Sequence, residues 1–171
     1  MSSRFMLTIL VLGAVTAAVG EELPTFTVEA QVGARHCRLE VDRLPYAGTR
    51  TDYWGKDGDP PAQVVRAIRL VVDGTVWPLP PEAFQDLSEV HYDTQIGFDQ
   101  QAGDGAVVVV VCGGDGAGAF DARLTLSDRQ LTRREISSGA GFVNETVEWR
   151  DGLLISRVYI NSYRATVEQQ K

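Results

Sequence analysis

Histidine and cysteine are scarce in this chain, which has two of each among its 171 residues. Because a structural zinc site uses four ligands, mostly Cys and His, two histidines without an established third ligand argue against one. The motifs G-x-S-x-G and H-E-x-x-H are also missing, and no Ser-His-Asp arrangement can be recognised. We therefore predict no metal, no cofactor and no catalytic residue, and we lean towards a protein that is not an enzyme.

Positively charged residues are also fewer than negatively charged ones. The chain has 16 Lys and Arg residues against 23 Asp and Glu residues, a formal net charge of −7. Nucleic acids and anionic membranes bind proteins through fields of Lys and Arg that replace counterions. The acidic balance therefore argues against both kinds of partner, and it does not indicate which neutral or basic partner is preferred.

Long apolar runs are missing after residue 20, and the one before it is short. Arg4 precedes an uncharged apolar stretch at residues 5–19 that ends in small residues. A membrane span needs about 20 apolar residues, so this stretch is more typical of a cleavable secretory signal peptide. We predict a signal peptide at residues 1–20 and one β-rich domain at residues 21–171. The domain would be secreted or periplasmic, with no integral membrane segment after signal removal.

The only two cysteines, Cys37 and Cys112, lie in strand-like segments of this exported chain. Exported proteins meet oxidising conditions in which disulfides persist, so we predict that the two residues pair. Such a bridge would close a long loop, and chain entropy gives it an upper value of about 4–5 kcal/mol of stabilisation. The alternative is that both are buried free thiols.

A run of valines marks the centre of the pattern. Five consecutive valines stand between Ala106 and Cys112. Branched side chains favour a pleated sheet, and the lack of polar residues predicts a central strand that is covered on both faces. Residues 113–118, which we call the glycine corner, then reverse the chain into a strand that alternates apolar and polar residues over positions 120–126.

The glycine corner could instead cradle a phosphate through its backbone N–H groups. A phosphate-binding loop needs a Lys followed by Ser or Thr, and a helix whose N-terminus faces the anion. Residues 119–121 begin a strand here, so we prefer the hairpin.

Two short turn signals predict further hairpins. Asp73-Gly74 separates residues 64–72 from residues 75–77, and Asp151-Gly152 separates residues 142–149 from residues 153–160. Asp-Gly dipeptides between such runs are typical of tight primed turns. Together with the other alternating segments they predict an all-β fold, an antiparallel β-sandwich or open barrel of about 8–10 strands. One short helix is expected near residues 81–87, where a proline begins the segment.

A two-residue turn at Asp151-Gly152 would fix the register of the last hairpin. It places Trp149 opposite Leu154 and Glu145 opposite Val158 on the inward face. Glu145 is then a carboxylate on an apolar face. It would be either a buried acid or a residue at the sheet rim beside an arginine or water, and we favour the rim.

Regular periodicity vanishes over residues 43–61, a long loop for a compact domain. The loop holds Tyr46, Tyr53 and Trp54 among several aspartates. Aromatic rings beside carboxylates suit a sugar face or a protein epitope, so these three residues, with Asp115 of the glycine corner, are our candidate binding residues. The alternative, which we favour, is that the aromatic rings fold back and cap the edge of the sandwich.

Five segments together resemble a group of small exported bacterial proteins of uncharacterised function that share a GGD-x-A-G core. The segments are residues 70–74 (LVVDG), 79–80 (LP), 84–87 (FQDL), 113–120 (GGDGAGAF) and 131–134 (LTRR). The resemblance implies a periplasmic or secreted bacterial protein, and it implies no particular activity. By analogy with the group, we expect the glycine corner to pack against the segment at residues 84–87.

These patterns lead to one functional expectation and two alternatives. We expect an exported, non-catalytic module that binds a protein or an envelope glycan through residues 43–61 and the neighbouring turns. A hydrolase that uses aspartates is the first alternative. An inhibitor or assembly subunit that pairs through an exposed edge strand is the second.

Overall fold

The computed structural model describes residues 23–56, 60–101, 105–138, 143–161 and 164–169. The predicted signal peptide at residues 1–20 lies outside the described residues. Within the described ranges, none of the helices has the length and apolar character needed to cross a bilayer.

The described residues form two antiparallel sheets, one of four strands and one of seven. The smaller sheet has the order β1-β2-β3-β4, with β1 at Phe26–Val32, β2 at Arg35–Pro45, β3 at Gln63–Val72 and β4 at Thr75–Trp77. The larger sheet has the order β11-β10-β9-β8-β7-β6-β5. Its strands are β5 at Ile96–Phe98, β6 at Ala106–Gly113, β7 at Phe120–Ser127, β8 at Gln130–Ser138, β9 at Val143–Arg150, β10 at Leu153–Asn161 and β11 at Arg164–Gln169.

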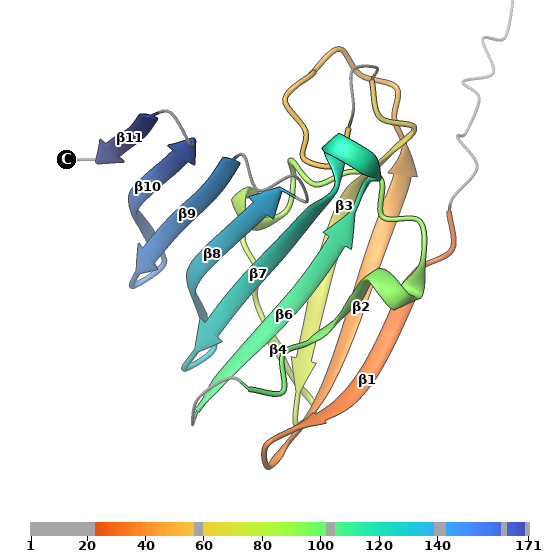
Figure 1. Ribbon diagram of the computed structural model, residues 1–171. Helices are drawn as coiled ribbons and strands as arrows, with labels where there is room; N and C mark the ends of the chain where they lie inside the picture. Colours follow the sequence, from red (N-terminus) through yellow and green to blue (C-terminus); the bar gives the residue numbers. More distant parts are fainter. Residues whose placement is uncertain (1–22, 57–59, 102–104, 139–142, 162–163, 170–171) are drawn as a thin grey trace, which may run out of the picture.

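The prediction of an all-β antiparallel sandwich is confirmed, and the sheets are open rather than closed into a barrel. Figure 1 shows β9, β10 and β11 extending away from the four-stranded sheet. The four-stranded sheet therefore does not cover all of the inner face of β9 and β10. The loops described below provide part of the remaining cover.

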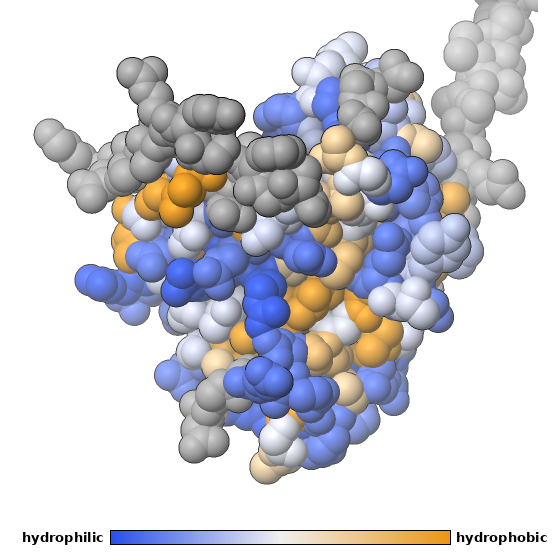
Figure 2. All heavy atoms as spheres, in the orientation of Figure 1, coloured by the Kyte–Doolittle hydropathy of each residue, from blue (hydrophilic) through white to orange (hydrophobic). Residues whose placement is uncertain are grey.

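The core lies between the two sheets and follows the alternation of each strand. Leu39 and Leu70 of the smaller sheet, and Val109 and Leu124 of the larger one, have no exposed area. Successive strand residues point to opposite faces, so the apolar residues of each strand reach the core together. The valine run is covered less completely on its outer face, where Val110 is only half-buried. In Figure 2 apolar surface runs along β6 between charged neighbours.

Both predicted Asp-Gly hairpins are confirmed. Asp73 and Gly74 have φ values of 49° and 77°, and Asp151 and Gly152 have 52° and 76°. Two consecutive positive φ values are what a type I′ turn requires, and the twist of this turn matches that of the flanking strands. The glycine corner also reverses the chain between β6 and β7, through a 3₁₀ turn at Gly116–Gly118 rather than a two-residue turn.

The predicted helix is a single 3₁₀ turn at Pro81–Ala83. Phe84 leaves the helical region with φ of −146°. Residues 84–86 then form a turn, closed by a hydrogen bond of 2.9 Å from Leu87 N to Phe84 O, and Leu87 forms a parallel bridge with Trp54. The segment is therefore too short for the two helical turns that its proline start allowed.

The prediction of a disulfide is wrong, because Cys37 and Cys112 are both free thiols. Cys37 lies on the inner face of β2 with no exposed area. Cys112 has the opposite parity to the inward residues Val109 and Val111, so its side chain lies on the outer face of β6. Its thiol donates a hydrogen bond of 2.8 Å to Asp121 Oδ1. One thiol is between the sheets and the other is outside them, which prevents pairing.

Both thiols should react slowly in the folded protein. Burial raises the pKa of Cys112 to about 12, helped by its hydrogen bond to Asp121 and by the charge of that carboxylate. Burial, followed by the charge of Asp73, also raises the pKa of Cys37. Thiolate is the reactive form, so alkylation of Cys112 at pH 9 should be on the order of a hundredfold slower in the native state than in urea.

The measurement is iodoacetamide modification followed by mass spectrometry, with the variant C37A to isolate Cys112. The folded pKa of Cys112 lies above its ordinary 9.0, so this thiol's contribution to stability is full below pH 9 and is lost as the pH rises towards 12. Equal alkylation rates of Cys112 in native and unfolded protein would contradict the structure. So would a wild-type protein that has no free thiol and a mass lower by two hydrogens.

The predicted register of the last hairpin is wrong beyond its first pairs. Leu154 faces Trp149 as expected, but a bulge between Leu154 and Ser156 shifts the pairing, so Tyr159 rather than Val158 lies opposite Glu145. One extra residue in one strand moves every following side chain to the other face. The bulge thus turns Arg157 and Tyr159 towards the side on which Glu145 lies.

Candidate binding site

The loop between β2 and β3 is organised by its own side chains. We call residues 46–54 the aromatic loop. The rings of Tyr46 and Tyr53 meet edge-on, with centroids 5.4 Å apart. Arg50 lies 5.0 Å from the Tyr53 ring centroid and donates two hydrogen bonds to Asp52, at 2.7 and 3.1 Å. These bonds hold the pKa of Asp52 below its ordinary value. The loop therefore has a defined shape despite its lack of regular structure.

Trp54 anchors this loop to the body of the protein. Its N–H donates to Asp86 O at 2.8 Å, and its carbonyl accepts from Ser88 N at 2.9 Å and from Ser88 Oγ at 2.6 Å. Its half-buried side chain packs against the core. Of the candidate residues, Trp54 thus fits the alternative that an aromatic ring caps the sandwich, whereas Tyr53, which is also half-buried, is not among the side chains that pack against the core.

A cavity of about 220 Å³, the loop cavity, lies between the aromatic loop and β10. It is lined by Arg50, Asp52, Tyr53 and Trp54 from the loop, by Asp86, and by Arg157 and Tyr159 from β10. Tyr46 is absent from this lining and acts by supporting Tyr53. The β10 side of the cavity exists because of the bulge.

A charge cluster adjoins the loop cavity and is formed by Asp86, Arg134, Glu145 and Arg157. Asp86 and Arg157 line the cavity, and Arg134 and Glu145 are buried behind them. Arg134 has no exposed area; its Nη2 donates to both Asp86 carboxylate oxygens at 2.8 and 2.7 Å and lies 3.1 Å from Glu145 Oε2. Arg157 Nε lies 3.3 Å from Glu145 Oε1. The contacts of Glu145 Oε2 and Arg157 Nε lack hydrogen-bond geometry and are therefore Coulombic attractions.

The cluster is electrically balanced, with two guanidinium groups and two carboxylates. Glu145 is 1% exposed, so the rim position that we favoured is wrong, although its arginine partners were part of that expectation. Burial and the nearby charge of Glu145 raise the pKa of Tyr159. Its phenol therefore stays neutral near pH 7 and keeps a hydroxyl hydrogen to donate.

Arg134, Arg157 and Tyr159 were missed by sequence reasoning. Arg134 carried a usable signal, because it shares the parity of the buried Ile136 on β8. Arg157 and Tyr159 carried none, because their face depends on the bulge in β10.

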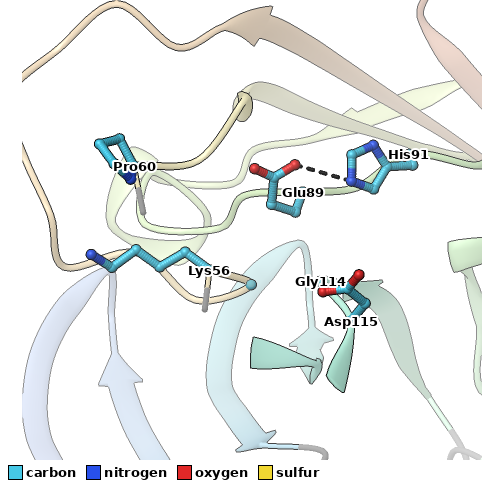
Figure 3. Close-up of a pocket in the computed structure, with 7 residues that line it drawn as sticks. Lys56, Pro60, Glu89, His91, Gly114 and Asp115 are labelled. Atoms are coloured by element: carbon cyan, nitrogen blue, oxygen red, sulfur yellow. Dashed lines mark ion pairs between the residues drawn. The ribbon is translucent and has the colours of Figure 1, made fainter. Parts of the chain in front are cut away.

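Asp115, the fourth candidate residue, lines a different cavity of about 260 Å³. Lys56, Glu89 and His91 line it too, together with the backbones of glycines (Figure 3). In Figure 3, Lys56 lies across the cavity from Asp115, and its ammonium group points away from Glu89. The structure thus separates Asp115 from the aromatic residues with which the sequence grouped it.

The histidine of this second cavity is fully engaged. His91 Nε2 lies 3.0 Å from Glu89 Oε2, and His91 Nδ1 lies 2.6 Å from Gln63 Nε2. Because both ring nitrogens have partners, His91 would have to break a contact to accept a proton from a substrate. Among the described residues, no group of three or more His, Cys, Asp or Glu side chains is placed to hold a metal ion.

Glycines allow Gly55, the residue that follows the aromatic loop, to lie close to Ser88 and to the glycine corner. A Cβ atom on Gly55 would lie 2.4 Å from Ser88 O, and one on Gly114 would lie 2.5 Å from Gly55 O. Gly114 N also donates to Glu89 O at 2.9 Å. The corner therefore packs against the residues that directly follow the segment at 84–87, close to the packing that the resemblance implied.

No protein-family model, no curated protein and no solved structure matches this chain.

Proposed function

We propose that this protein is an exported, non-catalytic module that binds a neutral, polyhydroxylated ligand such as an envelope glycan in the loop cavity. The observation that carries the proposal is the combination of aromatic rings with a balanced set of fixed charges around one small cavity. Export rests on the apolar run at residues 5–19, and the resemblance to exported bacterial proteins supports it.

The charge balance selects the class of ligand. Arg50 is paired with Asp52, and the charge cluster that adjoins the cavity contributes no net charge. A strongly charged ligand would leave one member of these pairs without its partner. A sugar both donates and accepts hydrogen bonds through its hydroxyl groups, so it can use the guanidinium, carboxylate and phenol groups together without a net charge.

The aromatic residues supply the apolar part of the contact. Tyr53 and Tyr159 line the cavity from two different segments, the loop and β10. An aromatic ring presents an apolar face and, in tyrosine, a polar end, which suits the mixed surface of a sugar ring. Since Tyr46, Arg50 and Asp52 already hold Tyr53 in place, little side-chain freedom remains to be lost on binding.

Replacing Tyr53 with alanine should weaken glycan binding about tenfold, because it removes the ring that lines the cavity from the loop side. The ligand is first found on an array of bacterial envelope glycans, and affinities are then measured by isothermal titration calorimetry. Tyr92→Ala is the matched control, since Tyr92 is 65% exposed and lies outside the aromatic loop.

Equal affinity of the Tyr53 variant and the control variant would remove the loop cavity from the proposal. Failure to bind any glycan, together with Tyr53-dependent capture of a purified envelope protein, would make the ligand a protein. Turnover of a bound glycan would replace the non-catalytic part of the proposal with a hydrolase.

A further inference from the structure

Arg43 is a buried cation whose hydrogen-bond partners are all neutral. Its residue exposure is 6%. Nη1 donates to Gln63 Oε1 at 2.9 Å and to Val90 O at 3.1 Å, and Nη2 donates to Pro24 O at 2.6 Å. Among the described residues, no carboxylate lies within ion-pair distance of this guanidinium. Arg134, the other buried arginine among the described residues, has two carboxylate partners.

The guanidinium of Arg43 retains donor capacity. A guanidinium has five N–H donors. Three of them are used by the contacts to Gln63, Val90 and Pro24, which leaves the Nε hydrogen and one Nη2 hydrogen. Nε is buried and has no hydrogen-bond partner. Nε and Nη2 together form the edge with which arginine binds both oxygens of a carboxylate.

Arg43 opens onto a groove of about 460 Å³, which we call the Arg43 groove. Its apolar lining comes from Leu23, Phe26, Pro45 and Ala62, and the Phe26 ring lies 3.5 Å beneath the Arg43 guanidinium carbon. None of the described residues that line the groove is acidic. Gln63 and His91 also line the groove and are hydrogen-bonded to each other, and the Glu89 carboxylate contacts Ala62 N and His91 just outside the lining. The groove therefore combines the charge of Arg43 with apolar contact along its remaining walls.

We propose that the Arg43 groove binds a small apolar carboxylic acid, whose carboxylate pairs with Arg43 and whose hydrocarbon part lies along the apolar lining. A buried charge is costly unless it is paired, and a ligand carboxylate supplies the missing partner. Leu23 and Pro24 precede β1 and belong to no strand, so the Pro24 carbonyl can turn to water and leave both Nη2 hydrogens, together with that of Nε, for the ligand carboxylate.

A carboxylate fits this lining better than a phosphate does. A phosphate group carries more charge and three acceptor oxygens, and the apolar walls would leave most of that charge without partners. The site is separate from the loop cavity and does not depend on the proposed glycan function, because the two cavities share no lining residue.

The direct test uses octanoate as the probe and NMR of the ¹⁵N-labelled protein as the readout. The Nε–H signal of Arg43 should shift on addition of octanoate and reach saturation. Octan-1-ol, which has the same chain and no charge, should bind about ten- to a hundredfold more weakly, the usual effect of a hydrogen bond to a charged group. This measurement needs no substitution in the protein.

Two variants locate the probe in the groove. Ala62→Trp adds bulk at an exposed position of the lining and should reduce octanoate affinity at least about tenfold, the effect of losing roughly one good apolar contact. Arg43→Lys should lose affinity to a similar degree, because an ammonium group cannot bind both carboxylate oxygens through a fixed planar edge. Arg69→Lys is the matched control: its side chain is 57% exposed, and its ion pair with Glu40 lies outside the groove.

Several outcomes would overturn the proposal. They are an unchanged Arg43 signal at high octanoate, equal binding of octanoate and octan-1-ol, and full affinity in the Ala62→Trp variant. A shift produced by inorganic phosphate as strongly as by octanoate would also overturn it, because the site would then recognise anions without an apolar part. If Arg43→Lys does not fold, the NMR signal and the Ala62 variant still decide.

Discussion

Replacing Arg134 with methionine is expected to lower the free energy of unfolding by about 3–5 kcal/mol, the usual result of removing one partner from a buried ion pair. Arg134 has no exposed area and contacts both Asp86 and Glu145. Methionine fills a similar volume and cannot neutralise either carboxylate. Asp86 would lose its ion pair with Arg134, and Glu145, which is 1% exposed, would keep only Arg157 in a site that water does not reach.

The measurement is equilibrium unfolding in urea, with Arg133→Met as the control. Arg133 is the preceding residue on β8, but its side chain is 47% exposed and its partner is Glu135 at 2.9 Å. An exposed pair contributes about 0–1 kcal/mol, so the control should change stability little. Similar losses in the two variants would show that Arg134 does not hold buried charge in solution.

A double substitution, which also removes a carboxylate, tests the same charge cluster. Glu145 has Arg134 and Arg157 as its ion-pair partners. If the loss in Arg134→Met comes from unpaired carboxylates, adding Glu145→Gln should restore part of it, because one of the stranded charges is removed. Strictly additive losses would instead indicate that the two side chains act independently.

Replacing Gly55 with alanine is expected to destabilise the protein by about 2–4 kcal/mol, since it combines backbone strain with a collision. Gly55 has φ of +102°, and a Cβ atom there would lie 2.4 Å from Ser88 O. Ser88 is fully buried and is tied to Trp54 by two hydrogen bonds, so neither side can move aside without loss. The chain that leaves the aromatic loop at Gly55 would be forced away from Ser88.

Gly105→Ala is the control for this substitution, with stability again measured by urea unfolding. Gly105 has a similar φ of +87°, but no atom lies within 4 Å of the position that a Cβ would take. It should therefore show only the cost of a left-handed residue, about 1–2 kcal/mol. Equal losses at the two glycines would mean that the close approach of Gly55 to Ser88 adds nothing. A larger loss at Gly55 would confirm that this approach holds the end of the aromatic loop against the body of the protein.

The candidate site was predicted only in part, because some of its residues have a local sequence signal and others are placed by packing alone. Tyr53 was found because aromatic residues stand out in a loop without periodicity, and it lines the loop cavity. Trp54 was found by the same signal but serves mainly as an anchor. Asp115 belongs to another cavity, because the glycine corner packs against residues 88 and 89 rather than against the tyrosines.

The sequence by itself determined the elements of this protein. Alternating apolar residues located the strands, and two Asp-Gly turns fixed two hairpins, which together define an all-β sandwich. These features depend on backbone preferences and on periodicity within a few residues, so they can be read without knowledge of the remainder of the chain.

Tertiary structure alone decided which side chains meet. A bulge beyond Leu154 brought Arg157 and Tyr159 to the side of Glu145, and the parity of β6 placed Cys112 outside the sandwich, away from Cys37. The partners of a buried charge come from segments far apart in the chain, so its neutralisation depends on register and layer contacts. A shift of one residue in a single strand exchanges the two faces of a sheet, and no local pattern reveals that shift.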